Sequence, residues 1–241
     1  MQKISRRGFL AILIPSSLAF MAYSYVETAR VLVTRLKLGL SAKVAFLVDT
    51  HIHSFGLVEE EVLELLKEEK PDVILHGGDV IDEFTQSLEP VETYLSSIEA
   101  EEKYAVLGNH DYWCGRSVEV LEILRRCEFK PLLDEVTESK VGRLLGVNWR
   151  DDRSYKLNSD ADIILAHDPN VALSDKSVRT KLILAGHTHG GVVVGGLTLF
   201  SNSAYTRGRY DLGGTTLYVS RGLGQMIPFR PTSPLELVII E

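Results

Sequence analysis

Cysteine is scarce in this sequence, with Cys114 and Cys127 the only two among 241 residues. So few thiols exclude a disulfide scaffold, and they also exclude a structural zinc ribbon, which needs four metal-binding side chains of this kind. The two cysteines could pair if the domain is exported, but we favour buried free thiols. No internal repeat, low-complexity tract or interdomain linker is present.

Positive charge is also in short supply. The formal net charge is -7 and the isoelectric point is near 5.6, which excludes a nucleic-acid partner because such proteins carry a basic stripe that neutralises phosphates. The acidic runs "VEEEVLELLKEEK" and "EAEEK" are typical of solvated helix faces. With 45% hydrophobic and 24% charged residues, the chain suits one soluble α/β domain with a sizeable core.

The N-terminus has a different character. A basic segment, "MQKISRRG", precedes an uncharged stretch from Gly8 to Val26, which is the order of an export or anchor signal rather than of a buried core helix. The motif "SRRGFL" resembles the twin-arginine signal, which directs folded proteins across a bacterial inner membrane. We therefore expect residues 1–40 to be a signal or membrane anchor and residues 41–241 to be an exported domain. A cytoplasmic location and cleavage of the segment both stay open.

Beyond residue 40, short apolar runs alternate with amphipathic ones, which predicts an α/β fold with strands that end in polar residues. Later segments lack helices between them and predict an antiparallel half. The expected strands are 43–49, 72–79, 103–111, 162–168 and 181–189, and the expected helices are 58–70, 85–101 and 117–128.

All the histidines lie in or just after these five strands. Ligand sites in open α/β sheets form at the carboxyl ends of strands, so loops that are distant in sequence are expected to converge there. Imidazole and oxygen ligands in this number suit two divalent ions, and this mixture suits manganese, iron or zinc better than calcium, which prefers oxygen ligands alone. We expect manganese, with iron, zinc or magnesium as alternatives. The candidate residues are His51, His53, His76, His110, His167, His187 and His189, together with Asp49, Asp79 and Asn109.

The stretch "VDTHIHS" allows two interpretations. His51 and His53 resemble the H-x-H motif of amidohydrolase and PHP hydrolase barrels, whereas Asp49 and His51 form a D-x-H motif. The later blocks "GGD", "GNHD", "LAHDP" and "GHTH" favour the second interpretation, since in order and chemistry they resemble the calcineurin-like metallophosphoesterases. The resemblance covers residues 43–241 and is strongest to membrane-associated or twin-arginine-exported phosphoesterases related to UDP-2,3-diacylglucosamine pyrophosphatases.

This resemblance implies a four-layer αββα sandwich of two mixed sheets flanked by helices. It also implies hydrolysis of a phosphoester or pyrophosphate, on a small molecule or a lipid-linked or cell-envelope substrate, by a hydroxide between two metals. His110 would act on the substrate as the catalytic residue, and Asp111 would orient its imidazole. One ion would be held by Asp49, His51, Asp79 and His189, and the other by Asp79, Asn109, His167 and His187.

Two other functions stay open: an amidohydrolase-type metal hydrolase, and a scaffold that keeps the fold without catalysis. His53 is expected to contact the substrate or a metal ligand, and His76 to make a buried hydrogen bond. Arg207, Arg209 and Arg221 could clamp a phosphate, although the sequence does not place them at the site.

Overall fold

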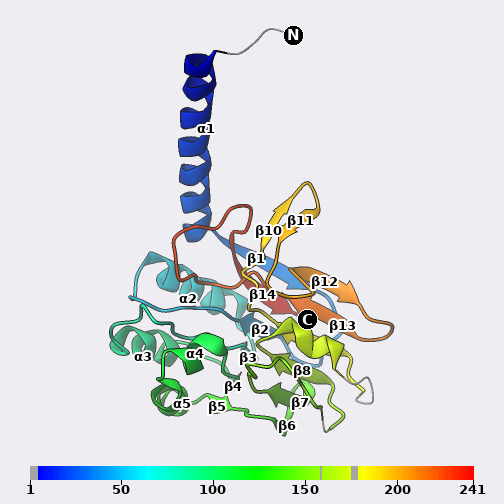
Figure 1. Ribbon diagram of the computed structural model, residues 1–241. Coiled ribbons are helices and arrows are strands. Elements are labelled where there is room, and N and C mark those ends of the chain that lie inside the picture. Colours follow the sequence, from blue (N-terminus) through cyan, green and yellow to red (C-terminus); the bar gives the residue numbers. More distant parts are fainter. Residues whose placement is uncertain (1–4, 158, 175–178) are drawn as a thin grey trace.

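The computed structural model describes residues 5–157, 159–174 and 179–241. Two sheets pack face to face, helices cover one side of the first sheet, and a long N-terminal helix stands away from the rest (Figure 1). The predicted α/β sandwich of two mixed sheets flanked by helices is confirmed. The first part of the predicted basic segment, residues 1–4, lies outside the described residues.

The first sheet has the strand order β1-β14-β2-β3-β4-β5. The pairs from β2 to β5 are parallel, whereas β14 is antiparallel to β2 and parallel to β1. Three of the five strands expected from the sequence, β2, β3 and β4, therefore lie side by side. The bounds are β1 Val31–Leu36, β2 Val44–Leu47, β3 Val73–His76, β4 Glu102–Ala105, β5 Lys130–Pro131 and β14 Leu235–Ile240.

The helices follow the strands of the first sheet in the expected order. One predicted helix, 85–101, is much shorter in the structure and runs only from Glu89 to Ser96, with Pro90 in its first turn. Proline has no N–H to donate and its ring clashes with the carbonyl one turn earlier, so the helix does not extend back to Thr85. The bounds are α2 Leu57–Glu69, α3 Glu89–Ser96, α4 Asn109–Trp113 and α5 Ser117–Arg126.

The second sheet has the order β12-β13-β9-β8-β7-β6. The expectation of an antiparallel half is only partly met, since β7, β8, β9 and β13 are parallel neighbours and only the two edge pairs are antiparallel. Parallel strands are usually joined by α-helices. No α-helix separates these strands in the sequence, so their parallel pairing could not be recognised from the sequence pattern. The bounds are β6 Glu135–Ser139, β7 Gly142–Val147, β8 Ile163–Ala166, β9 Leu182–Ala185, β12 Gly208–Asp211 and β13 Thr216–Val219.

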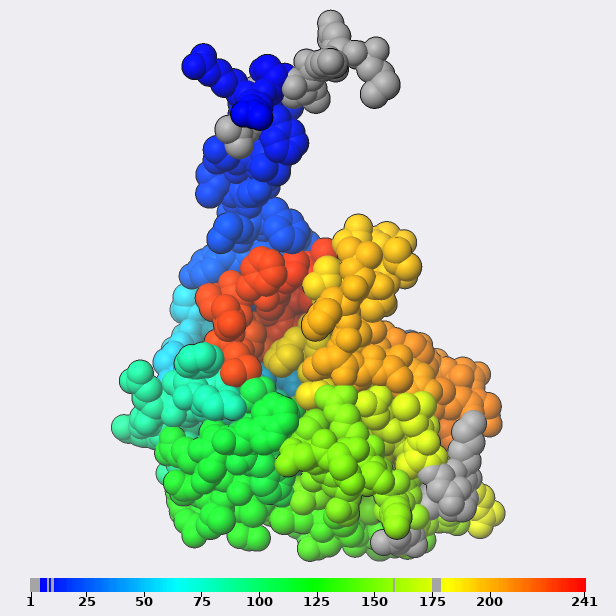
Figure 2. Space-filling model, in the orientation of Figure 1, coloured from blue at the N-terminus to red at the C-terminus, as the bar shows by residue number. Residues whose placement is uncertain are grey.

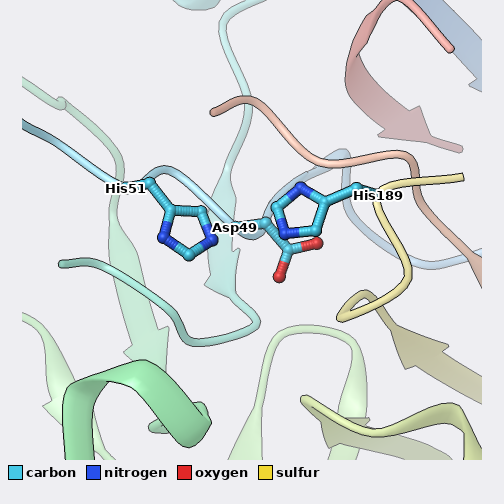
Figure 3. A group of neighbouring side chains, drawn as sticks. All are labelled: Asp49, His51 and His189. Carbon is cyan, nitrogen blue, oxygen red and sulfur yellow. The ribbon is translucent and has the colours of Figure 1, made fainter. Parts of the chain in front are cut away.

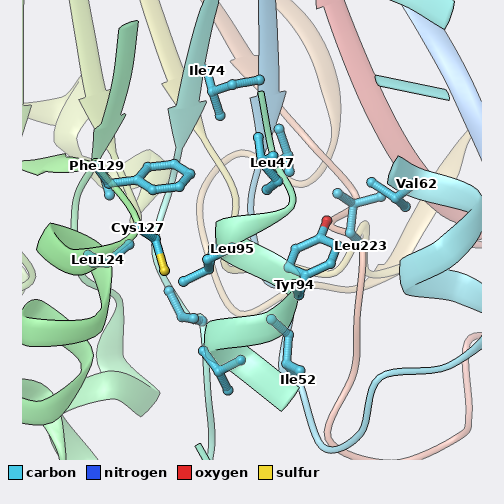
Figure 4. Close-up of a cluster of buried hydrophobic side chains, with 14 of the residues drawn as sticks. Leu47, Ile52, Val62, Ile74, Tyr94, Leu95, Leu124, Cys127, Phe129 and Leu223 are labelled. Atoms are coloured by element: carbon cyan, nitrogen blue, oxygen red, sulfur yellow. The ribbon is translucent and has the colours of Figure 1, made fainter. Parts of the chain in front are cut away.

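Apolar side chains fill both faces of the first sheet. In β2, Val44 and Phe46 point towards the second sheet, whereas Ala45 and Leu47 point towards the helices, as the two-residue period of a strand requires. Figure 4 shows the helix-side cluster, in which Tyr94 of α3 packs near Leu47. The outer face of the second sheet is covered by the 3₁₀ helix η2, Pro169–Leu173, and by loops.

The N-terminal helix α1, Arg6–Val26, is followed by the 3₁₀ helix η1, Glu27–Ala29, and then by β1. Within the described part of the chain, no helix has both the length and the apolar character needed to cross a membrane. Strand β1 pairs with β14 along its whole length. The sheet therefore already includes residues 31–36, which the sequence had assigned to the N-terminal segment, because the backbone groups of β1 complete the hydrogen-bonded edge of β14.

A separate two-stranded hairpin, β10 Val192–Val194 and β11 Leu197–Phe200, lies outside both sheets. Gly195 and Gly196 form its turn with positive φ angles of 58° and 84°, the conformation that a tight two-residue hairpin needs. Cys114 and Cys127 are both free thiols, Cys127 buried and Cys114 partly buried.

Candidate dimetal centre

The candidate ligands lie on loops that follow parallel strands of both sheets. Asp49 follows β2, and its carboxylate accepts a hydrogen bond from the backbone N–H of His187, which follows β9, at 2.9 Å. His167 follows β8, and its Nδ1 lies 2.9 Å from the carbonyl oxygen of Gly77, after β3. These contacts join the carboxyl ends of the two sheets, so residues that are far apart in sequence meet in one place.

The side chains gather into two groups. In the first, single ligand atoms of Asp49, His51 and His189 all lie within 4.8 Å of one another, and Figure 3 shows the three side chains side by side. In the second, the same holds for Asp79, His167 and His187. All six are buried except His189, which is partly exposed. We refer to these as the first and the second triad.

Asp79 belongs to the second triad and also reaches the first. Its Oδ2 atom is 3.1 Å from Nε2 of His167 in the second triad and 3.7 Å from Nε2 of His51 in the first. Asn109, at the start of α4, places its Oδ1 atom 3.0 Å from Nε2 of His167. One carboxylate thus reaches both groups, and the amide oxygen extends the second, which is the ligand arrangement expected for two ions that share Asp79.

The imidazole of His51, in the first triad, is a buried polar group without hydrogen-bonding partners in the described part of the chain. Both ring nitrogens of His51 are buried and, within the described residues, lack a hydrogen-bonding partner; the carboxylate of Asp82 is 3.0 Å from Nδ1 but outside hydrogen-bonding geometry. A buried polar group without a partner is costly. A cation would satisfy one nitrogen, and imidazole with carboxylate is the ligand mixture of manganese, iron and zinc sites. The residues therefore fit a pair of divalent ions.

Backbone strain is concentrated at the same place. Non-glycine residues rarely adopt positive φ angles, and such conformations persist where the surrounding structure holds them, often at functional sites. No residue pattern in the sequence indicated these strained conformations. Five candidate ligands have left-handed φ angles: Asp49 (51°), His51 (42°), Asp79 (52°), His187 (69°) and His189 (49°).

Burial and neighbouring charges shift the pKa values of the candidate ligands. Burial lowers the pKa of His187 to about 2, with a contribution from the nearby His167, and burial also holds the pKa of His189 well below its usual value. Burial disfavours the charged form of Asp79 as well, but His167 outweighs this and holds the pKa of Asp79 well below its usual range. His187 and His189 are therefore neutral and Asp79 is ionised, which are the forms that bind metal. Although burial opposes it, the nearby Asp79 raises the pKa of His167 to about 9, so an ion bound there would displace a proton from this imidazole.

The glycines of "GGD" and "GNHD" allow the ends of β3 and β4 to touch. A Cβ atom on Gly78, whose φ angle is 90°, would lie 2.4 Å from the backbone nitrogen of Gly108. Asp111 fixes this contact, because its carboxylate accepts hydrogen bonds of 2.9 Å from the N–H groups of Gly108 and Asp79, and further ones from Val80 and Ile81. The prediction that Asp111 orients the imidazole of His110 is therefore wrong; Asp111 holds the backbone that carries Asp79.

His110 instead pairs with Glu83, whose carboxylate lies 2.7 Å from Nδ1. The neighbouring Asp82 is within 3.0 Å of both His51 and His53, so His53 contacts a neighbour of the first triad and lies outside both triads. Sequence reasoning missed both carboxylates. The signal was present, since "GGDVIDE" places them three and four residues after Asp79.

Arg153 is the arginine at the centre. Its Nη2 atom contacts Nε2 of His187, its guanidinium carbon lies 5.5 Å from the ring centroid of Trp149, and Nε is 3.6 Å from the buried Asp168. By contrast, Arg221 pairs with the buried Glu236. Three further predicted residues have other partners: Arg207 donates to the carbonyl of Thr232, Arg209 to Thr216, and His76 makes buried hydrogen bonds with Thr50 and Gly78.

Sequence comparisons with known proteins identify the family of this chain. Residues 42–191 match the family model described as calcineurin-like phosphoesterase. An uncharacterized metallophosphoesterase of Aquifex aeolicus is 30% identical, with 91% of this chain and 94% of that protein covered. Phosphodiesterase YaeI of Escherichia coli is 27% identical over 99% of each chain. A solved archaeal phosphodiesterase gives a TM-score of 0.48 at 16% identity, covering 75% of this chain and 84% of that one.

The chain therefore belongs to the family of calcineurin-like phosphoesterases, and it is a metallophosphoesterase with two His/Asp groups suited to a pair of metal ions.

Proposed function

We propose that this protein is a phosphodiesterase that uses two divalent ions, with manganese preferred. The first and second triads would hold them, with Asp79 of the second triad shared by both ions and Asn109 as a further ligand. The observation that carries the proposal is the position of the Asp79 carboxylate, within 3.1 Å of His167 and 3.7 Å of His51. Two cations bound there would lower the pKa of a water molecule and neutralise charge on the phosphoryl oxygens. The phosphodiesterase name of the Escherichia coli relative, which matches along its whole length, supports the choice of a diester.

His110 has the position of the proton donor. Its side chain is 15% exposed, its Nδ1 is held by Glu83, and its ring lies 5.3 Å from that of His51. Nε2 is thereby left free to face a bound substrate, where it donates a hydrogen bond to a phosphoryl oxygen or a proton to the departing alkoxide. Glu83 acts through His110, because its contact with Nδ1 limits the orientations of the imidazole ring.

Arg153 supplies a second positive group beside the triads. Its contact with Asp168 and its position against Trp149 limit the conformations of the guanidinium, and a fixed guanidinium binds phosphate oxygens with two parallel hydrogen bonds. We assign it to the phosphoryl group on the side of His187.

The proposal is tested with bis-p-nitrophenyl phosphate and manganese. Turnover should appear with the metal, disappear with a chelator, and be lost in Asp79→Asn, because this substitution weakens both ion sites together. Asp72→Asn serves as the matched control, since Asp72 is a partly buried carboxylate at the other end of β3 that accepts a hydrogen bond from the backbone N–H of Lys43 and lies outside both triads. Near-normal turnover in Asp79→Asn would show that the shared carboxylate is not required.

Two alternative functions are less well supported. An amidohydrolase-type site would need His53 as a ligand, and His53 lies against Asp82 outside both triads. A scaffold without catalysis is expected to lose ligands, whereas each of the seven ligand positions keeps a metal-binding side chain.

We also propose that the N-terminal segment holds the domain at a membrane after export by a twin-arginine route. The support is the motif "SRRGFL" and the row of exposed apolar side chains on α1, among them Ile12, Leu18 and Met21. Protease added to intact spheroplasts should digest the domain. Protection until the membrane is permeabilised would place the domain on the cytoplasmic side.

A further inference from the structure

The surface around the hairpin β10–β11 is apolar and unusually exposed. Leu197, Leu199 and Phe200 are each more than 60% exposed, and Val194 is 54% exposed. All four residues of β11 are exposed, so apolar groups project from both faces of the strand. A two-stranded hairpin with this composition is marginal in water by itself, and large exposed apolar patches mark interaction sites.

Two neighbouring segments continue this surface. The loop 225–229 exposes Ile227 and Phe229, and the ring of Phe229 lies 6.1 Å from that of Phe20 on α1. Thr232, just after this loop, accepts a hydrogen bond from Val193 of β10 at 3.2 Å. Hairpin, loop and the end of α1 thus form one continuous apolar surface, which we call the apolar rim. In Figure 2 the hairpin, the loop and α1 lie on the same side of the molecule.

The apolar rim carries almost no charge. No charged residue occurs between His189 and Arg207, or from Gly222 to Phe229, in a chain where 24% of residues are charged. Arg230, which follows the loop, is buried and donates to backbone carbonyls. Segments that enter lipid must exclude charges and carry apolar side chains, because a charged group in hydrocarbon is costly.

The shape favours a lipid surface over a protein partner. The hairpin projects from the domain (Figure 1) and needs an apolar environment on both faces. A bilayer surrounds an inserted hairpin on all sides, whereas a protein would need a matching socket. The exposed apolar side chains of α1 near its contact with the loop, such as Phe20, add to the same surface.

The apolar rim begins at the metal centre. The hairpin follows His189 after two glycines, and the carbonyl oxygen of Gly224, at the start of the loop, lies 3.1 Å from Nδ1 of His189. We propose that the hairpin and loop 225–229 insert into the interfacial region of a lipid bilayer, and that the phosphodiester substrate belongs to the head group of a bilayer lipid. The second part of this proposal rests on the proposed phosphodiesterase function.

The insertion is tested on the full chain with a tryptophan reporter. Phe200→Trp places an indole on the hairpin, and Val118→Trp, at an equally exposed apolar position on α5, is the matched control. Vesicles of phosphatidylcholine and phosphatidylglycerol are prepared with and without brominated acyl chains, and quenching is measured relative to the unsubstituted chain. Quenching should occur for Phe200→Trp and be absent for Val118→Trp. Equal quenching of both, or of neither, would overturn the insertion.

The same variant tests for a protein partner. The emission of Phe200→Trp is measured in vesicle-free buffer as the protein concentration rises. If it shifts to the blue, and vesicles cause no quenching, a second copy of the chain occupies the apolar rim and the lipid proposal is wrong. Burial of a Leu or Phe side chain corresponds to roughly a tenfold to hundredfold change in partition. Leu197→Asp with Phe200→Asp should therefore reduce the vesicle-bound fraction at limiting lipid.

Turnover then tests the substrate. The double variant should hydrolyse soluble bis-p-nitrophenyl phosphate at the unmodified rate but hydrolyse vesicle-embedded phospholipid more slowly. Equal rates on vesicle lipid would overturn the assignment of a bilayer substrate. If Phe200→Trp is quenched by brominated lipid yet the unmodified chain hydrolyses neither substrate, insertion stands and the proposed function fails.

Discussion

Replacement of Gly78 by alanine should disturb the metal centre although Gly78 contributes no ligand. The added Cβ would lie 2.4–2.9 Å from backbone atoms of Leu107 and Gly108, and backbone cannot rotate away as a side chain can. The positive φ angle of 90° adds about 1–2 kcal/mol for a residue with a Cβ. Overpacking adds about 1–3 kcal/mol, so the free energy of unfolding should fall by about 2–5 kcal/mol in total.

Gly39→Ala is the matched control, because Gly39 has a similar φ angle of 71° but no heavy atom within 4 Å of the added Cβ. It should lose only the conformational part, about 1–2 kcal/mol. Urea unfolding of the metal-free protein measures both losses, and titration calorimetry measures manganese binding. Gly78→Ala should also bind manganese more weakly, since Asp79 and Asn109 must separate. Equal stability and equal metal affinity in the two variants would refute this explanation of the glycine pair.

Three further predictions concern catalysis, ligands and pH. His110→Asn should keep its metals while kcat on an alkyl phosphodiester falls roughly 10²–10⁴-fold. The loss should be smaller on a p-nitrophenyl ester, because its leaving group needs no proton. A uniform loss on both substrates would argue against proton donation. His51→Ala should lower the metal content measured by plasma mass spectrometry, whereas His53→Ala should leave it nearly unchanged; equal losses would revive the H-x-H interpretation. Glu236, which is buried, accepts hydrogen bonds from Tyr218 and Arg221, and although burial opposes ionisation, Arg221 lowers its pKa from 4.5. The ionised Glu236 therefore contributes its full stabilisation above pH 4.5, the ordinary pKa of the group, and this stabilisation is lost as the pH falls through the lowered pKa of the folded protein. Glu236→Gln should cost about 3 kcal/mol near pH 7, less near pH 4, and a constant loss in urea unfolding across this range would contradict the ion pair.

The sequence predicted those features that depend on local patterns. Polar residues at the ends of apolar strands, such as Asp49 after β2 and His167 after β8, identified the loops that converge. Strand order at the second sheet was less accessible, because β13 pairs in parallel with β9 although no α-helix separates them in sequence. Periodicity reports which residues are buried, and it does not report which strands are neighbours.

The missed residues depend on three-dimensional contacts. Arg153 reaches His187 from a loop after β7, and it reads in the sequence as an ordinary surface arginine. Asp111 seemed a natural partner for the adjacent His110, but its carboxylate turns towards four backbone N–H groups. Adjacent side chains on a helix point in different directions, and the orphaned N–H groups at the start of α4 and after β3 attract a carboxylate. Only the arrangement of the backbone reveals this preference.

The central claim, that two ions share Asp79, is tested most directly by anomalous diffraction from crystals grown with manganese. Two peaks are expected, separated by about 3.5–4 Å, one beside Asp49, His51 and His189 and the other beside His167 and His187, with Asp79 between them. A single peak, or a peak coordinated by His53 in place of Asp79, would contradict the account.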